Sequence, residues 1–358
     1  MNIISIVGAR PQFIKLAPLH SVSNEINNII VHTGQHFDNN MSNIFFNQMN
    51  LPKPKYNLDI SGGTHGKQTG KMLIGLEQIM IKEKPDLVIV FGDTNSTLAG
   101  SLSASKLGIP LLHIESGLRS FNNSMPEEIN RILSDHCSDF LFAPTVRAMD
   151  NLKAEGLEEK SFLTGDIMVD SVNLFLSEAR KKSKIIETLN LVGQDYYLLT
   201  LHRPYNVDDP EKITLILLML SNIGNRIVFP VHPRTRQIIN KYNIEVNDNI
   251  SLIDPLGYFD FLVLQDSSIK ILTDSGGIQK EAYILQKPCI TIRPETEWVE
   301  TVDIGWNKLI NPNPDNFEEL SALIKSFNPS SNSQENIFGE NVSDNMKKII
   351  IKILDDGK

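Results

Sequence analysis

Charged side chains are concentrated in one segment of the first half of the chain, residues 115–131 (ESGLRSFNNSMPEEINR), directly after an apolar stretch. Its acidic and basic residues are Glu115, Arg119, Glu127, Glu128 and Arg131. Carboxylates can move protons and guanidinium groups can hold an anionic leaving group, so the segment predicts acid–base chemistry on an anionic substrate. Glu127 and Glu128 also follow Pro126 at the expected start of a helix, where carboxylates offset the helix dipole. Glu115 has no such explanation. It follows a buried strand, where a carboxylate is expected to have either a partner or a raised pKa.

Two more motifs of the first half follow expected strand ends. In residues 8–15 (GARPQFIK), Pro11 suits the first position of a helix, which places Arg10 and Lys15 near a helix N-terminus. An anion is favoured there, although two solvated cations on a surface turn are the simpler alternative. Asp93, in the sequence FGDTNS, follows another strand and is either an acid–base group or only the N-cap of the next helix.

The second half carries histidines at two expected strand ends. His202 and Arg203 follow one strand, and His232 follows the next in the sequence PVHPR. Single histidines are commonly structural, but two histidine-bearing ends on adjacent strands predict contact with a common ligand. Their spacing differs from HExxH, so the sequence does not predict a zinc site.

A serine and two glycines, Ser275, Gly276 and Gly277, join another expected strand to a helix. Glycines let the backbone approach a ligand closely, and the free N–H groups at a helix start can bind phosphate. Glu281, about one turn further on, is placed to reach ribose hydroxyls. A tight turn without a ligand is the structural alternative, since neither GxGxxG nor the Walker pattern GxxxxGK[ST] is present at these turns.

Composition places the chain among globular proteins. Its 358 residues are 41% apolar and 22% charged, and this length predicts two domains. A net charge of −9 disfavours nucleic acid as a partner. No apolar run reaches the roughly 20 residues of a membrane span, and residues 1–7 predict a strand rather than a signal peptide. Two cysteines, Cys137 and Cys289, are too few for a disulfide framework and fit a reducing cytoplasm.

Short β-branched stretches alternate with amphipathic stretches in both halves. The expected strands span residues 3–7, 29–32, 87–91, 111–114, 140–143, 162–164, 197–201, 226–231, 250–253, 269–273, 289–292 and 308–310. The expected helices span residues 66–84, 96–107, 210–223, 259–265, 277–285, 317–326 and 343–354. This alternation predicts an α/β fold of two doubly wound parallel sheets, whose strand ends face a cleft that holds the ligand.

We place the two predicted domains at residues 1–170 and 171–358, with the last helix able to pack back on the first domain. The polar residues 177–190 between them fit either a linker with a short helix or a solvated face.

The chain resembles the non-hydrolysing UDP-N-acetylglucosamine 2-epimerases in seven motifs that follow the same order. They are GARPQFIK, GDTNST, HIESGLR, MPEEINR, LHR, PVHPRT and LTDSGGIQKEA. The resemblance runs from residue 3 to about residue 300 and implies two Rossmann-like domains of the GT-B type, with a UDP-sugar in the cleft. It also implies a cytoplasmic homodimer that makes precursors of cell-surface polysaccharide and needs neither a metal nor a nicotinamide cofactor.

The same resemblance implies roles for individual residues. Asp93, Glu115 and Glu127 are the implied acid–base carboxylates, and His202 would assist the departure of UDP. The implied substrate-binding residues are Arg10, Lys15, Arg131, Arg203, His232, Phe261, Ser275, Gly276, Gly277, Glu281 and Arg293. Within this set the serine and glycines would bind phosphate, Glu281 would bind the ribose and Phe261 would lie beside uracil.

Some stretches resemble one branch of the family, which acts on UDP-2,3-diacetamido-2,3-dideoxy-glucuronate. These stretches are GARPQF, GGTHG at residues 62–66 and TEWVE at residues 296–300. Many members have an arginine where Trp298 stands, and HRPYN at residues 202–206 replaces the common HRRE. UDP-N-acetylglucosamine and the diacetamido-glucuronate sugar both stay open as substrates.

The implied reaction removes the carbon-2 proton while UDP leaves carbon 1, and then adds UDP back after protonation on the opposite face. One alternative is a GT-B glycosyltransferase that uses a UDP-sugar donor. The others are a hydrolysing epimerase that releases UDP and a non-catalytic protein that binds nucleotide sugars. Exchange of the carbon-2 hydrogen with solvent in the absence of an acceptor distinguishes epimerisation from sugar transfer.

Overall fold

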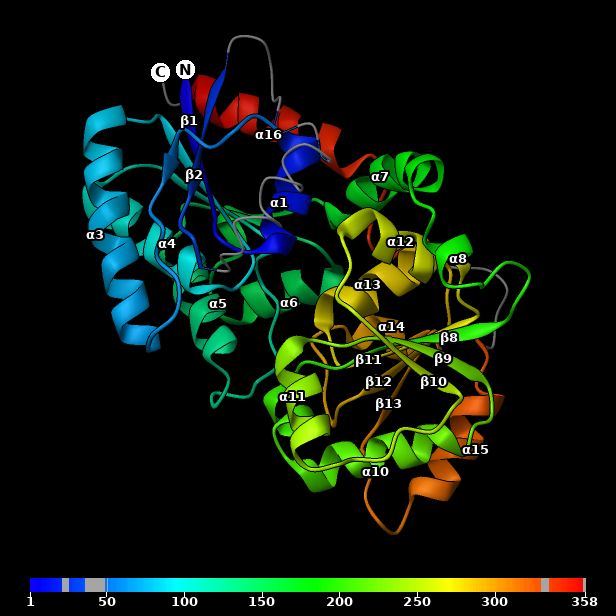
Figure 1. Ribbon diagram of the computed structural model, residues 1–358. Coiled ribbons are helices and arrows are strands. Elements are labelled where there is room, and N and C mark those ends of the chain that lie inside the picture. The colour runs from blue at the N-terminus through cyan, green and yellow to red at the C-terminus, as the bar shows by residue number, and fades with distance from the viewer. Residues whose placement is uncertain (21–25, 36–48, 50, 330–334, 357–358) are drawn as a thin grey trace. The chain divides into compact units, whose positions relative to one another are not determined.

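The computed structural model describes residues 1–20, 26–35, 49, 51–329 and 335–356. The chain divides into two compact units (Figure 1). Unit 1 comprises Met1–Leu174 and Asn336–Lys358, and unit 2 comprises Phe175–Glu335. The C-terminal segment therefore belongs to the same unit as the N-terminus.

Unit 1 is built on a seven-stranded parallel sheet in the order β3-β2-β1-β4-β5-β6-β7. The strands are β1 (Asn2–Val7), β2 (Asn27–His32), β3 (Tyr56–Asn57), β4 (Leu87–Phe91), β5 (Leu111–Ile114), β6 (Phe140–Ala143) and β7 (Ser161–Leu163). The inner strands β4 and β5 are buried along their whole length, as expected of a sheet covered on both faces. The strand order reverses between β1 and β4, and parallel α/β sheets bind ligands outside the carboxyl ends of the strands at such a point.

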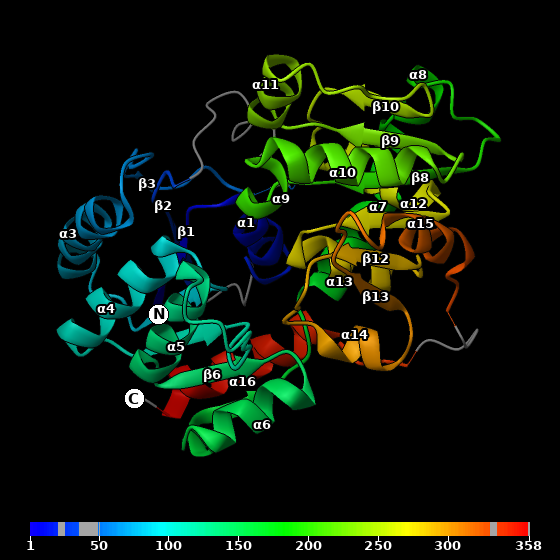
Figure 2. The ribbon, with the colours of Figure 1, turned by 90° about the horizontal axis from the view of Figure 1, so that it is seen from below.

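The helices of unit 1 lie on both faces of this sheet, with α3 and α4 on one side of β1 and β2 and with α1 and α16 on the other (Figures 1 and 2). They are α1 (Arg10–Leu16), α3 (His65–Glu83), α4 (Asn95–Leu107), α5 (Pro126–Cys137), α6 (Val146–Ala154) and α16 (Val342–Asp356), with the short η1 (Ala17–Leu19) and η2 (Glu158–Lys160). The last helix, α16, is anchored at its start by a hydrogen bond of 2.7 Å from Ser343 N to Asp170 Oδ2.

Unit 2 repeats the architecture with a six-stranded parallel sheet in the order β10-β9-β8-β11-β12-β13. The strands are β8 (Tyr196–Thr200), β9 (Arg226–Pro230), β10 (Ile250–Ile253), β11 (Lys270–Thr273), β12 (Cys289–Ile292) and β13 (Asn307–Ile310). Its order reverses between β8 and β11, so unit 2 has a switch point of its own.

Helices α10 and α15 cover one face of the unit 2 sheet and α12 and α13 the other (Figures 1 and 2). The helices are α8 (Ile185–Thr188), α9 (Pro204–Val207), α10 (Pro210–Ser221), α11 (Pro233–Lys241), α12 (Tyr258–Ser267), α13 (Gly276–Ile284), α14 (Val299–Asp303) and α15 (Phe317–Ser326). Apolar side chains of α10, among them Ile213, Ile216 and Leu217, fill the core under β8 and β9.

The predicted fold class is confirmed, since both sheets are parallel and each is covered by helices on its two faces. The two-residue strand β3 was missed, because Tyr56 and Asn57 are too short a stretch to show alternation. Residues 177–190 are largely helical: α7 (Met168–Lys182) extends into them and α8 follows. No helix in the described part of the chain is both long and apolar enough to cross a bilayer.

Candidate active site

Strand ends beside the switch point of unit 1 bring two of the predicted carboxylates together with cations. Glu115 follows β5 with a backbone φ of 73°, and its carboxylate forms an ion pair with Lys15 of α1. Only 8% of the Lys15 side chain and 12% of the Glu115 side chain are exposed. Gly92, at the end of β4, leaves room for this pair, since a Cβ there would lie 3.3 Å from Lys15 Nζ and 3.8 Å from Glu115 Oε2. Glu115 thus has the partner that its position requires.

Arg131 joins Glu128 of the segment 115–131 to the predicted carboxylate Asp93. Its guanidinium lies 2.5 Å from Asp93 Oδ2 and 2.8 Å from Glu128 Oε2. Asp93 keeps 32% of its side chain exposed, whereas Glu128 keeps only 1%. The Glu128 carboxylate also accepts backbone N–H groups of Ser120 and Phe121 at 2.9 to 3.0 Å. Glu128 therefore binds the backbone of residues 120 and 121 and the side chain of Arg131, whereas Asp93 stays accessible.

The remaining predicted residues of unit 1 lie at the same edge of the sheet. Arg10 is the first residue of α1, directly after the end of β1, and is partly buried. Glu127 lies in the first turn of α5 beside Glu128 and is also partly buried. Both positions agree with the helix starts expected from Pro11 and Pro126.

Gln12 is a residue of this edge that sequence analysis missed. Its side-chain oxygen accepts N–H groups of Gly8 at 2.7 Å and Ala9 at 3.0 Å, and its amide nitrogen donates to the Phe91 carbonyl at 2.7 Å. These bonds tie the turn after β1 to the end of β4. An uncharged glutamine inside an apolar helix stretch gives no chemical signal, so only the fold reveals this role.

A buried histidine lies behind the turns that carry Asp93 and Glu115. His113 Nδ1 is 2.7 Å from Asp135 Oδ1, and His113 Nε2 is 2.7 Å from the Gly92 carbonyl oxygen. Asp135 Oδ2 also accepts the Gly117 N–H at 3.0 Å and pairs with Arg119 at 2.7 Å. Burial would raise the pKa of Asp135, but the hydrogen bond and charge of His113, together with Arg119, hold that pKa below its usual range. Arg119 therefore serves the scaffold and is not available to a substrate.

The carboxyl ends of four neighbouring strands of unit 2 carry three predicted residues and one that was not predicted, Asp274. In the sheet order, His232 follows β9, His202 follows β8, Asp274 follows β11 and Arg293 follows β12. His232 is exposed and begins α11, where its Nδ1 accepts the N–H of Arg234 at 3.3 Å. The two histidine-bearing strands are neighbours in the sheet, as expected.

Asp274 organises the His202 end and was not predicted. Its carboxylate accepts the N–H groups of His202 at 3.1 Å and Arg203 at 3.0 Å, and the Asn206 side-chain amide at 3.1 Å. His202 Nδ1 lies 3.2 Å from Asp274 Oδ1, and 49% of the His202 side chain is exposed. Loss of contact with water lowers the pKa of His202. The negative charge of Asp274 opposes this shift, and the positive charges of Arg203 and Arg293 add to it. This shift favours the neutral ring.

The predicted glycine turn begins helix α13, with Ser275 as its N-cap. A Cβ at Gly276 would lie 2.1 Å from Glu297 Oε1, so this position faces a packed interior. A Cβ at Gly277 would meet no atom within 4 Å, so this position faces open space. The first N–H groups of α13 have no partners within a helix and can bind an anion.

Two further residues of the predicted set lie on adjoining helices. Glu281 of α13 accepts a hydrogen bond of 2.6 Å from Gln265 of α12. Phe261 lies one turn before Gln265 on α12 and is partly buried. The pairing of Gln265 with Glu281 therefore brings the helix of Phe261 beside the helix of the glycine turn.

In the stretch 296–300, where the chain departs from the family pattern, residues 296–298 are buried and residues 299 and 300 are partly buried. Trp298 is 1% exposed, and Lys280 Nζ lies 4.3 Å from the centroid of its ring. Arg293 pairs with Glu297 at 3.0 Å, with 2% and 5% of the two side chains exposed. Trp298 thus supports α13 from the interior, through a cation–π contact that an arginine at this position could not make.

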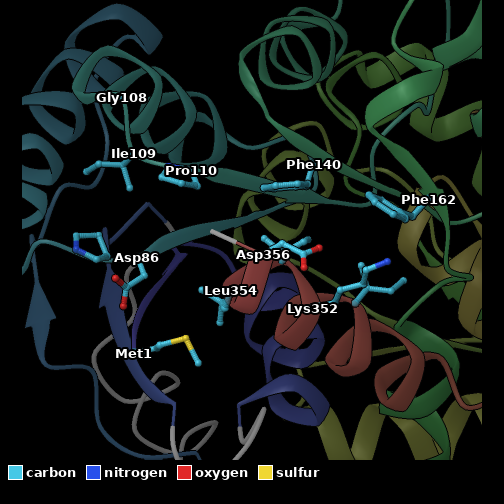
Figure 3. A pocket seen from close by; sticks show the side chains of 13 residues that line it. Met1, Asp86, Gly108, Ile109, Pro110, Phe140, Phe162, Lys352, Leu354 and Asp356 are labelled. Carbon is cyan, nitrogen blue, oxygen red and sulfur yellow. The ribbon is translucent and has the colours of Figure 1, made fainter. Parts of the chain in front are cut away.

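In the described part of the chain, the predicted site coincides neither with a metal cluster nor with the cavity at the opposite edge of the unit 1 sheet. Among the described residues, no group of three or more His, Cys, Asp or Glu side chains is placed to hold a metal ion. A cavity of about 640 Å³ lies at the amino-terminal edge of the unit 1 sheet, between α16 and the strand starts near Asp86, Pro110 and Phe140 (Figure 3). Its lining is mainly apolar and includes none of the predicted site residues.

The two parallel sheets and their switch points define the class: an α/β protein of two Rossmann-like domains, as in the GT-B type. A family model for UDP-N-acetylglucosamine 2-epimerases matches residues 20–354. The chain belongs to this family, in its non-hydrolysing form. It is therefore an isomerase, and the epimerase interpretation prevails over the glycosyltransferase alternative.

Individual relatives match nearly the whole chain. A UDP-N-acetylglucosamine 2-epimerase homolog of Methanococcus maripaludis is 50% identical over 346 residues, which cover 95% of this chain and 96% of the relative. The UDP-2,3-diacetamido-2,3-dideoxy-D-glucuronate 2-epimerase of Pseudomonas aeruginosa is 51% identical over 320 residues, with 87% and 88% covered. The crystal structure of Methanocaldococcus jannaschii UDP-GlcNAc 2-epimerase in complex with UDP-GlcNAc and UDP has a TM-score of 0.89 at 44% identity. That match covers 98% of this chain and 99% of the other.

Proposed function

We propose that this protein inverts carbon 2 of a UDP-2-acetamido sugar by eliminating UDP and adding it back. A base takes the carbon-2 hydrogen as a proton, the C–H electron pair forms a double bond to carbon 1, and the bond from carbon 1 to the phosphate oxygen breaks. UDP leaves with the electron pair of the broken bond between carbon 1 and oxygen. In the return step the phosphate oxygen attacks carbon 1 while carbon 2 receives a proton on the opposite face. Atoms and charge balance without a redox cofactor.

One observation carries the proposal most strongly: two carboxylates at neighbouring strand ends of unit 1, each with its own cation. Glu115 pairs with Lys15, and Asp93 pairs with Arg131. An acid and a base on separate supports are what inversion requires, because the proton leaves one face and returns to the other. We propose that Glu115, Asp93 and Glu127 share this proton transfer, with Arg10 and Lys15 facing the diphosphate and sugar.

We propose that unit 2 holds the UDP group. The start of α13, with Ser275, Gly276 and Gly277, would take the phosphates on its N–H groups. Arg203 and Arg293 would neutralise the charge that develops on departing UDP, and His202 and His232 would contact the diphosphate. Glu281 would bind the ribose and Phe261 would lie against the uracil.

Two UDP-sugars are candidate substrates. UDP-N-acetylglucosamine, giving the manno epimer, is supported by the family match and by the archaeal relatives. UDP-2,3-diacetamido-2,3-dideoxy-glucuronate is supported by the Pseudomonas relative. Proton NMR with each sugar in turn decides between them, since the anomeric signal of the new epimer reports conversion directly.

The elimination step is tested with a sugar that carries ¹⁸O between carbon 1 and phosphorus. If UDP leaves and its terminal phosphate rotates, the label moves to non-bridging positions at a rate comparable with epimerisation. Inversion with the label fixed in the bridge would contradict the proposal. Accumulation of free UDP in step with free sugar would instead identify a hydrolysing enzyme.

We further propose that the protein is a cytoplasmic homodimer whose product enters cell-surface polysaccharide. Membership of the epimerase family supports these three statements. Sedimentation equilibrium at micromolar concentration tests the dimer, and a monomer mass throughout the range would contradict it.

A further inference from the structure

A single buried pair, His113 and Asp135, contacts both of the turns that carry the acid–base carboxylates of unit 1. His113 Nε2 reaches the carbonyl of Gly92, the residue before Asp93, at 2.7 Å. Asp135 Oδ2 accepts the N–H of Gly117, two residues after Glu115, at 3.0 Å. The side chains of His113 and Asp135 are both 0% exposed.

The hydrogen-bonding partners of His113 define its protonation state. The Gly92 carbonyl can only accept a hydrogen bond, and so can an ionised Asp135 carboxylate. A neutral imidazole has one N–H and would leave a ring lone pair facing an oxygen at 2.7 Å. A protonated Asp135 donating to a neutral ring is the alternative. Arg119 at 2.7 Å from Asp135 Oδ2 disfavours it, because a guanidinium stabilises the carboxylate.

We propose that His113 is an imidazolium with both nitrogens protonated, and that with Asp135 it is a positioning residue for Asp93 and Glu115. The inference rests on the proposed epimerase function. Charges alternate along the chain of contacts from His113 to Asp135, Arg119 and Glu155, whose carboxylate lies 2.7 Å from Arg119 Nε. The imidazolium is therefore neutralised within the scaffold. The pair of Lys15 with Glu115 lies beside Gly92.

The His113–Asp135 pair helps to fix the conformation of two turns that lie beyond the hydrogen bonds of the strands. Gly92 has a φ of 64° and Gly117 a φ of 79°, so both peptides leave the strand geometry. The Gly92 N–H is held by the Ile114 carbonyl at 3.0 Å, and His113 holds the other side of the same residue. The His113–Asp135 pair thus contributes to the separation of Asp93 from Glu115, together with the bonds that Asn130 Nδ2 and Arg131 make to Asp93.

The protonation state is tested by NMR of protein with ¹⁵N-labelled histidine at pH 7.5. The His113 signal is assigned by its loss in His113→Phe. Two protonated ring nitrogens are expected. In Asp135→Asn the amide can still accept the Gly117 N–H and donates to Nδ1, so one ring nitrogen should lose its proton. A wild-type ring with one unprotonated nitrogen would overturn the imidazolium.

The positioning role is tested by the kinetics of the same variants. Asp135→Asn should lower kcat about a hundredfold, the scale of a small misplacement of reacting groups, with KM and UDP affinity within twofold of wild type. Glu158→Gln, a change at an exposed carboxylate of unit 1 that pairs with Lys153, is the control and should leave kcat unchanged. A wild-type kcat in a folded Asp135→Asn protein, or equal changes in kcat and UDP affinity, would overturn positioning.

Failure of the proposed function would give a different result from failure of the positioning role alone. If the wild-type protein turned over neither UDP-sugar, the epimerase proposal would fail and the positioning role with it. The NMR result on the ring nitrogens would still decide the protonation state of His113.

Discussion

The strand ends of unit 1 and unit 2 have the same topology, but they differ in how far their polar and charged side chains are buried and paired. In unit 1 the charged groups are paired and largely buried, as in Lys15 with Glu115 and Arg131 with Glu128. In unit 2 the corresponding edge presents an exposed His232, a half-exposed His202 and a helix start open at Gly277. The first arrangement suits proton transfer between fixed groups, and the second suits an anionic ligand that arrives from solvent. The comparison predicts that changes in unit 1 affect turnover and that changes in unit 2 affect UDP affinity.

The largest expected effect comes from Glu115→Gln. Loss of a general acid–base group lowers kcat by about 10² to 10⁴-fold, while UDP affinity stays near that of wild type. Glu83→Gln is the matched control, because Glu83 pairs with Lys55 at the periphery of unit 1 and takes no part in the proposed chemistry. Steady-state kinetics and calorimetry with UDP measure the two quantities. A Glu115→Gln enzyme of normal kcat would break the comparison.

Glu281→Gln should produce the reverse pattern. A charge-assisted hydrogen bond to the ribose contributes enough that its loss weakens UDP binding about tenfold or more, with kcat at saturation unchanged. The control in the same unit is Glu318→Gln, on the exposed first turn of α15. If the Glu281 change lowered kcat and left the affinity for UDP intact, the assignment of UDP to unit 2 would be wrong.

Two adjacent glycines separate folding from binding within unit 2. Gly276→Ala places a Cβ 2.1 Å from Glu297 Oε1 and should lower the free energy of unfolding by about 1–3 kcal/mol. Gly277→Ala meets no atom within 4 Å, so stability should hold while the Cβ obstructs a phosphate and weakens UDP binding. Chemical denaturation and calorimetry distinguish the two. Equal UDP affinity in Gly277→Ala and wild type would remove this turn from the proposed phosphate site.

The smallest expected effect is a change in the titration of His202. Its pKa is lower in the folded protein than in the unfolded chain, so the unfolded chain binds more protons over the pH range between the two pKa values. The free energy of unfolding therefore falls as the pH drops through that range. Because Asp274 raises the pKa of His202, Asp274→Asn should move the His202 titration to still lower pH. Histidine NMR across pH 4–8 measures the shift, and a move to higher pH would contradict the account.

The sequence was sufficient for the strand ends and insufficient for the groups that hold them. Glu115, Asp93 and His202 were predicted because chemically active residues directly follow apolar strands. Gln12 and Asp274 were not, although both organise a strand end through hydrogen bonds to backbone groups. Such contacts depend on which strands become neighbours, and local sequence does not report that order. Glu128 shows the same limit, because the sequence does not distinguish it from its neighbour Glu127. Only the structure shows that Glu128 is the one buried beside Arg131.

The measurement that tests the central claim most directly is epimerisation in deuterated water, followed by proton NMR of the UDP-sugar. The account predicts that the product carries deuterium at carbon 2 from its first turnover, and that the remaining substrate acquires it as the reaction reverses. Complete inversion at carbon 2 with the original hydrogen retained would contradict proton transfer by the carboxylates of unit 1.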